Sequence, residues 1–167
     1  MKKFCLFFIA VIVVFAAGCG GGERAVSKDP RFERKGDKTI KDALTGMVWT
    51  ENAFTPGPED CRPGETRTWQ GALDYIRCLN EYSFLGYEDW RLPSVYNLES
   101  LLYPDKTLNF IWLEKQGFKK LQAGWYWSST AIDEYPDYAW VVSMNYTIGY
   151  RDNKKYKWHV WPVRGGK

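Results

Sequence analysis

The residue types that carry out covalent or metal chemistry are scarce in this sequence of 167 residues. It holds one histidine, His159, and four cysteines. Histidine-rich zinc sites and Ser–His–Asp triads both depend on histidine, so a single one leaves little room for either chemistry. We therefore expect no catalytic residue, no metal site and no cofactor.

Two of the cysteines, Cys61 and Cys78, lie 17 positions apart in the body of the chain. Redox-active pairs usually have the spacing CxxC, which the sequence lacks. An even pair in an oxidising compartment favours a structural disulfide, and closing a loop of this size contributes about 3 kcal/mol to stability. Two free thiols or a redox pair are the alternatives.

Acidic residues gather at Glu88–Asp89 and at Asp133, Glu134 and Asp137. Paired carboxylates hydrolyse glycosides only at a set separation within a cleft, and a calcium site needs several converging oxygens. Neighbouring positions in a sequence establish neither arrangement. A glycoside-hydrolysing pair and a calcium site therefore remain alternatives to ordinary surface charge. We expect a non-enzymatic protein.

Aromatic and basic residues offer a different chemistry, which is binding. Exposed aromatic rings stack on sugars, and cations make charge-assisted hydrogen bonds to sulfate or carboxylate groups. The alternative for the aromatic run Trp125–Trp127 is that it fills the core of a sheet. The alternative for the basic residues between Arg151 and Lys157 is a solvated turn. Lys115, Lys119 and Lys120 form a second basic cluster. The candidate ligand-binding residues are Trp125, Tyr126, Arg151, Lys154, Lys155 and Lys157.

The first residues resemble a bacterial lipoprotein signal. Lys2 and Lys3 precede an apolar run from Phe4 to Ala17, which is followed by Gly18 and Cys19. We predict a signal peptide over residues 1–18, a lipidated Cys19 with a flexible tether over residues 19–30, and one domain over residues 31–167. Gly20 favours the outer membrane. An ordinary signal peptide or an uncleaved anchor is the alternative.

Removing that signal changes the charge of the protein. The full chain carries 23 Lys and Arg against 20 Asp and Glu, a formal charge of +3. Without Lys2 and Lys3, 21 cationic side chains face 20 acidic ones. A near-neutral body argues against nucleic-acid binding through bulk charge.

Periodicity and turn residues predict the elements that must position these side chains. Helices come early and strands come late, which indicates the α+β class. Thr68 and Ser94 are the expected N-caps of the two helices. The predicted elements are a hairpin of Lys38–Lys41 and Met47–Thr50, a loop over 51–67, helices over Trp69–Asn80 and from Val95 to Tyr103, and strands at Trp125–Thr130, Tyr138–Tyr146, Thr147–Arg151 and Lys157–Val163.

Four blocks, DWRLP at 89–93, YWSS at 126–129, VRGG at 163–166 and an opening stretch from Arg31 to Trp49, resemble the Legionella collagen-like protein C-terminal domain family. The family usually has Gly where Lys38 stands and Asn where Ala43 stands. The resemblance implies a C-type-lectin-like fold, with two helices flanking a twisted antiparallel sheet and long loops. The structural signature it carries over is Asp89, Trp90, Arg91, Pro93, Trp127, Ser128, Ser129, Arg164 and Gly165.

The signature residues have two readings, because buried polar side chains can either staple loops together or hold a ligand. We favour the staple. The resemblance also implies a binding role, since its best-known member is an adhesin that binds sulfated polysaccharide and forms trimers. We expect a membrane-anchored, lectin-like module for sulfated or acidic glycan, with homo-oligomerisation open. The alternatives are a structural or protein-binding envelope module, or an enzyme distantly related to the formylglycine-generating group.

Overall fold

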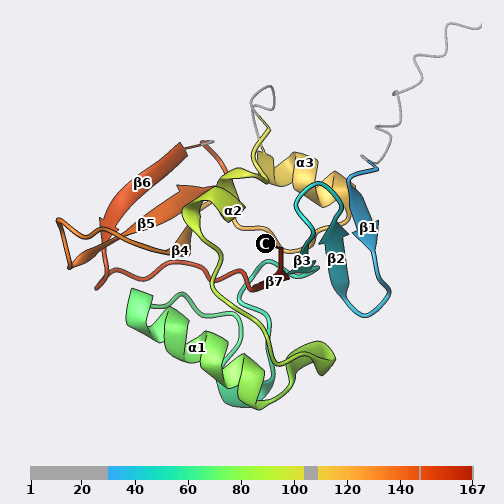
Figure 1. Cartoon of the computed structure of the whole chain (residues 1–167), viewed down its shortest axis with the longest axis horizontal. Coiled ribbons are helices and arrows are strands. Elements are labelled where there is room, and N and C mark those ends of the chain that lie inside the picture. The colour runs from blue at the N-terminus through green and yellow to red at the C-terminus, as the bar shows by residue number, and fades with distance from the viewer. Residues whose placement is uncertain (1–29, 104–108, 147, 167) are drawn as a thin grey trace, which may run out of the picture.

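A computed structural model describes residues 30–103, 109–146 and 148–166. The predicted signal peptide, Cys19 and the tether lie outside the described residues, apart from Pro30. The described chain is α+β, as predicted, but it builds two antiparallel sheets where the resemblance implied one (Figure 1).

The first sheet joins the two ends of the domain. It contains β1 (Phe32–Arg34), β2 (Thr39–Asp42), β3 (Met47–Thr50) and β7 (Val163–Gly165), in the order β1-β2-β3-β7. The predicted opening hairpin is confirmed as β2 and β3, and β1 adds a strand that the sequence analysis did not assign. The C-terminal strand pairs with β3, so the last residues of the domain lie beside its first hairpin.

The predicted last strand over Lys157–Val163 is wrong, since only its final residue enters β7. The preceding residues make single bridges to two different segments. Trp158 exchanges backbone hydrogen bonds with Arg67, and His159 bonds to β4 residues on either side of Tyr126. Pro162 also lacks the N–H that a continuous ladder would need.

The second sheet carries the late strands. It contains β4 (Trp125–Ala131), β5 (Tyr138–Ser143) and β6 (Ile148–Asn153), in chain order. Two of these strands differ slightly from the prediction, because β5 ends at Ser143 and β6 continues through Asp152 and Asn153, which were expected to turn. The turn follows at Lys154 and Lys155.

Three α-helices lie among the described residues, where two were expected. Helix α1 (Trp69–Glu81) matches its prediction to within one residue, and the Thr68 hydroxyl caps it by accepting from the Gly71 amide. Helix α2 (Val95–Glu99) begins at the predicted Ser94 cap but ends four residues early. Helix α3 (Asn109–Gln116) was not predicted. Two short 3-10 turns, η1 (Glu59–Cys61) and η2 (Phe84–Gly86), complete the set.

Two hydrophobic clusters meet at the second sheet. Tyr126 and Val142 face a cluster built with the first sheet, α2 and α3, whereas Trp127 and Val141 face a cluster built with α1. Every described member of both clusters lies between Phe32 and Val163. The described domain therefore contains its own core.

The disulfide predicted between Cys61 and Cys78 is present, with Cα atoms 5.9 Å apart. It ties the flank of α1 to η1, which lies within the predicted loop over 51–67. Over the ranges that the structure describes, no helix has the length and apolar character needed to cross a bilayer.

Candidate functional site

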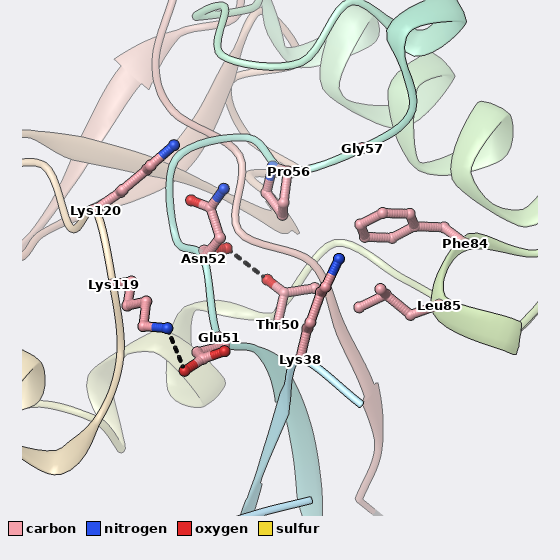
Figure 2. A pocket seen from close by; sticks show the side chains of 10 residues that line it. All are labelled: Lys38, Thr50, Glu51, Asn52, Pro56, Gly57, Phe84, Leu85, Lys119 and Lys120. Atoms are coloured by element: carbon pink, nitrogen blue, oxygen red, sulfur yellow. Dashed lines mark hydrogen bonds and ion pairs between the residues drawn. The ribbon is translucent and has the colours of Figure 1, made fainter. Parts of the chain in front are cut away.

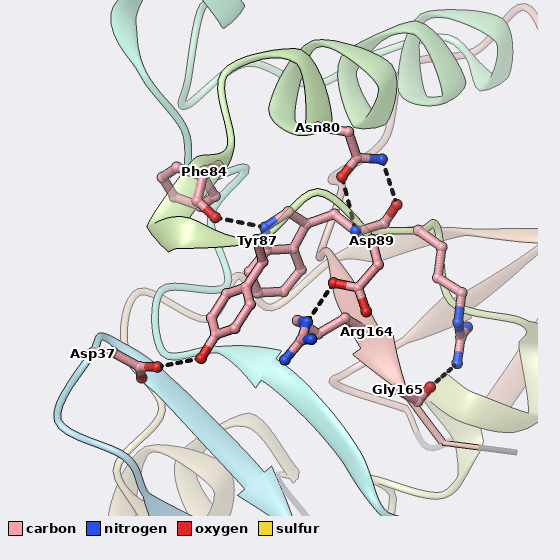
Figure 3. Close-up of polar contacts among 9 residues, drawn as sticks. Asp37, Asn80, Phe84, Tyr87, Asp89, Arg164 and Gly165 are labelled. Atoms are coloured by element: carbon pink, nitrogen blue, oxygen red, sulfur yellow. Dashed lines mark hydrogen bonds and ion pairs between the residues drawn. The ribbon is translucent and has the colours of Figure 1, made fainter.

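The signature residues meet where the loop after η2 crosses β7 (Figure 3). Arg164 Nε donates to an Asp89 carboxylate oxygen at 2.5 Å, and the guanidinium carbon lies 3.8 Å from the centre of the Tyr87 ring. The Tyr87 hydroxyl in turn donates to Asp37 at 2.8 Å. A chain of polar contacts thus connects β7, the loop and the turn before β2.

Two neighbours of Asp89 anchor the loop from the inside. Trp90 is buried, its indole donates to the Phe84 carbonyl, and its backbone N–H and carbonyl both bond to the Asn80 side chain on α1. Arg91 donates to Asn97 Oδ1 and to the Gly165 carbonyl. Each of these contacts gives a polar group of a loop or strand a hydrogen-bond partner within the chain. The residues therefore hold the loop in place, as the staple interpretation expects.

The remaining signature residues lie at β4. The Ser129 amide donates to the Pro93 carbonyl, which ties β4 to the start of α2. Ser128 is buried, and its carbonyl accepts from the Trp69 indole at 2.8 Å. The Trp127 indole donates to the Arg67 carbonyl at 2.7 Å. These three positions therefore join α1, α2 and the second sheet.

Hydrogen bonding shifts the ionisation of this network. The bond from Arg164 lowers the pKa of Asp89. Burial raises the pKa of Asp37, but the bonds from Thr39 and Tyr87 outweigh it and the net pKa is lowered. The same bond to Asp37 raises the pKa of Tyr87. Both carboxylates are thus held in the charged form, as staples require.

The aromatic run does not form the expected surface. Tyr126 is fully buried: its ring lies 5.9 Å from that of Trp161, and its hydroxyl accepts from the Gln122 amide. Burial raises its pKa. The expectation that Tyr126 contacts a ligand is wrong, because β4 lies between the two core clusters. Trp125 is only partly buried and contacts the Tyr150 ring at 6.1 Å.

The four basic candidates do not act as one cluster. The Lys154 ammonium donates to the Pro136 carbonyl and lies 4.3 Å from the centre of the Trp69 ring. Lys157 lines a hollow beside His159, whereas Arg151 lines a different one. Lys155 is exposed at the turn. The register of β5 and β6 and the turn that follows separate these side chains.

A cavity of about 250 Å³ at the second sheet brings together groups suited to binding. Tyr135, Tyr138, Tyr150 and Arg151 line what we call the tyrosine cavity. All three tyrosines are exposed, and the Arg151 guanidinium carbon lies 5.6 Å from the centre of the Tyr135 ring. Flat rings beside a guanidinium can stack on a sugar ring and bind its anionic substituent.

Sequence reasoning found Arg151 in this cavity but missed its three tyrosines. Tyr135 and Tyr138 flank a Pro-Asp turn, and Tyr150 lies on the edge strand β6. Aromatic residues at a turn and on an edge strand were the available signal. The adjacent aromatic residues at β4 were the stronger pattern in the sequence.

Other chemistry is sparse over the described ranges. No group of three or more His, Cys, Asp and Glu side chains is placed to hold a metal ion there. His159 stacks against Phe54 and Tyr126, and burial lowers its pKa, which favours the neutral ring.

A second hollow, of about 370 Å³, lies between the first sheet, η2 and the segment after α3 (Figure 2). It shares no lining residue with the tyrosine cavity. We call it the lysine cavity, since Lys38, Lys119 and Lys120 line it together with Phe84, Leu85, Pro56, Gly57, Thr50, Glu51 and Asn52.

Comparison with known proteins places the chain in a family. The family described as the Lcl C-terminal domain matches residues 38–164, which is most of the sequence and nearly the whole described domain. Asp89, Arg91 and Arg164 of the staple network fall inside that match, whereas Asp37 and Gly165 lie just outside it. No curated protein matches the chain.

Proposed function

Because the chain belongs to the Lcl C-terminal domain family, we propose that it is a non-enzymatic binding module for acidic or sulfated glycan, with a C-type-lectin-like fold. The module is held at the bacterial envelope through an acylated Cys19. The observation that carries the proposal is the tyrosine cavity, in which Arg151 is set among three exposed aromatic rings.

The chemistry of that cavity matches such a ligand in two ways. Tyr135 and Tyr138 meet edge to face at 6.2 Å, so they present differently oriented apolar surfaces to a sugar. Arg151 has no carboxylate partner among the described residues, and a guanidinium can bind a sulfate or carboxylate with two parallel hydrogen bonds. Because the chain without its signal peptide is nearly neutral, its selectivity for an anionic glycan must come from local contacts such as that of Arg151.

A glycan array and heparin chromatography test the proposal on residues 23–167, which contain every described residue of both core clusters. We expect binding to sulfated glycans and retention on heparin that weakens as salt increases. Arg151→Gln should reduce both, whereas Arg77→Gln, which removes an exposed arginine on α1, should leave both unchanged. Flow-through of the unsubstituted domain at low salt contradicts the proposal.

Envelope anchoring has its own test. The full chain expressed in a Gram-negative host should incorporate radiolabelled palmitate and fractionate with the outer membrane. Cys19→Ser should abolish both the label and the membrane association. Labelling that survives this substitution contradicts the assignment of Cys19.

A protein-binding role is the second candidate, and one observation favours it. Leu44 and Tyr96 are 75 % and 77 % exposed, and both line a hollow of about 330 Å³ beside Arg91 and Gly166. Exposed apolar residues around a hollow are typical of an interface. A single envelope protein captured by the domain and lost with Tyr96→Ser would support this role.

A further inference from the structure

The lysine cavity combines apolar and cationic side chains. Figure 2 shows Phe84 and Leu85 on one side, together with Lys38, and Lys119 and Lys120 on the other. Phe84 and Leu85 are only partly buried, so their apolar surface is open to the hollow. Pro56 and Gly57 also line the hollow. Position 57 requires glycine, because a Cβ atom there would lie 2.9 Å from the Leu79 side chain and from the Tyr75 hydroxyl.

The charge of the cavity is positive and only partly compensated. Glu51 is the acidic lining residue, and its carboxylate already binds Arg34 and, at 3.0 Å, Lys119. Neither Lys38 nor Lys120 forms an ion pair with any described residue. Two ammonium groups from distant segments of the chain are therefore available to an anion in the hollow.

The backbone around the cavity is strained. Six described residues other than glycine have a left-handed φ, and three of them line this one hollow: Lys38 at 65°, Leu85 at 55° and Lys120 at 55°. Two others, Thr55 and Ser83, adjoin lining residues along the chain. Such conformations are unusual for long or branched side chains, and they gather at sites where a fold must hold particular groups in place.

We propose that the lysine cavity binds a small amphipathic anion, in which a sulfonate, sulfate, phosphate or carboxylate group is attached to an apolar ring or chain. Lys38 binds the anionic group, Lys120 adds positive charge from the opposite side of the hollow, and Phe84, Leu85 and Pro56 contact the apolar body. A free inorganic anion leaves the apolar wall uncovered, and a neutral ring leaves both ammonium groups without a partner. The site is independent of the tyrosine cavity, because the two hollows have no residue in common.

Calorimetric titration of residues 23–167 with 1-naphthalenesulfonate tests the proposal. Inorganic sulfate supplies the anion without the ring, and 1-naphthylmethanol supplies the ring without the anion. We expect the sulfonate to bind with submillimolar affinity and each control compound to bind at least about tenfold more weakly. Absence of sulfonate binding, or equal binding of either control compound, overturns the proposal.

Three matched variants locate the binding. Lys38→Gly and Lys120→Gly each remove one cation at a backbone position that suits glycine. Lys38→Gly should weaken sulfonate binding about tenfold, and Lys120→Gly should weaken it to a smaller extent. Arg62→Gly is the control, since Arg62 is also cationic, exposed and left-handed (φ 50°) but does not line the cavity. Binding that is unaffected by both lysine variants, or weakened equally by Arg62→Gly, overturns the proposal. Thermal unfolding of each variant confirms that it folds.

Discussion

Arg164 is held on two sides, by the face of the Tyr87 ring and by the carboxylate of Asp89. The two contacts differ in burial. The Arg164 side chain is 24 % exposed, whereas that of Asp89 is 56 % exposed. Ion pairs that open to solvent contribute little to stability, but a guanidinium packed on a ring retains its contact. Most of what Arg164 contributes therefore comes from packing.

This difference predicts unequal effects of removing the two partners. Asp89→Ala should lower the free energy of unfolding by less than about 1 kcal/mol. Arg164→Ala should lower it by about 1–2 kcal/mol, since the aliphatic stem and the ring contact are both lost. Urea unfolding followed by tryptophan fluorescence measures both values. Loss of glycan binding by Asp89→Ala at an unchanged melting temperature would instead make Asp89 a ligand residue.

The pair of Arg31 and Asp42 lies deeper and predicts a dependence on pH. Burial raises the pKa of Asp42, but bonds from Arg31 at 2.7 and 2.5 Å and from the Leu44 amide lower it overall. The folded pKa is then below the unfolded value of about 3.9, so the unfolded chain takes up the proton first as the pH falls. The stabilisation is complete above that value and is lost as the pH falls through the folded pKa.

Asp42→Asn isolates this contribution. At pH 7 it should cost about 3 kcal/mol, because it leaves the charge of Arg31 without its buried carboxylate. The difference in unfolding free energy between the two proteins should narrow steadily as the pH falls below about 4, the unfolded pKa of the carboxyl group. A difference that stays constant over that range would show that the carboxylate is not the source of the stabilisation.

Sequence patterns predicted the elements that are continuous and local. Helix α1 was found because its cap and its apolar stripe are both written in neighbouring residues. Helix α3 was missed although its buried positions, Asn109, Trp112, Leu113 and Gln116, have helical spacing. Two of those four side chains are polar, so the stripe is interrupted when it is read as hydrophobicity alone.

The two cavities were harder to predict, because each is assembled from distant segments. The tyrosine cavity depends on the register that places Arg151 opposite Trp140 and on a turn that returns Tyr135 to the same place. The lysine cavity depends on left-handed backbone at Lys38 and Lys120, which residue propensities do not indicate. Local patterns carry no information about either pairing.

The disulfide between Cys61 and Cys78 should be a substantial part of the stability of the domain. Residues 23–167 contain only these two of the four cysteines, so reduction acts on one bond. Reduction should lower the free energy of unfolding by about 3 kcal/mol, the value expected for a loop of this length. The double variant Cys61→Ala/Cys78→Ala should melt at the same temperature with and without reductant. If reductant leaves the melting temperature of the unsubstituted domain unchanged, the bond does not form in solution.

Lys38 predicts an opposition between stability and binding. Its φ of 65° lies in the left-handed region, where a side chain costs about 1 kcal/mol relative to glycine. The Lys38 ammonium makes no ion pair with a described residue that would offset this cost. Lys38→Gly should therefore raise the free energy of unfolding by about 1 kcal/mol while it weakens binding of 1-naphthalenesulfonate.

The two effects are measured on the same sample, by urea unfolding without ligand and by calorimetry with it. Lys38→Gln is the informative companion, because it removes the charge but keeps a long side chain at the left-handed position. It should weaken binding as much as the glycine variant and leave stability near that of the unsubstituted domain. If Lys38→Gln binds normally while Lys38→Gly does not, the conformation of the turn, and not the ammonium, controls the cavity.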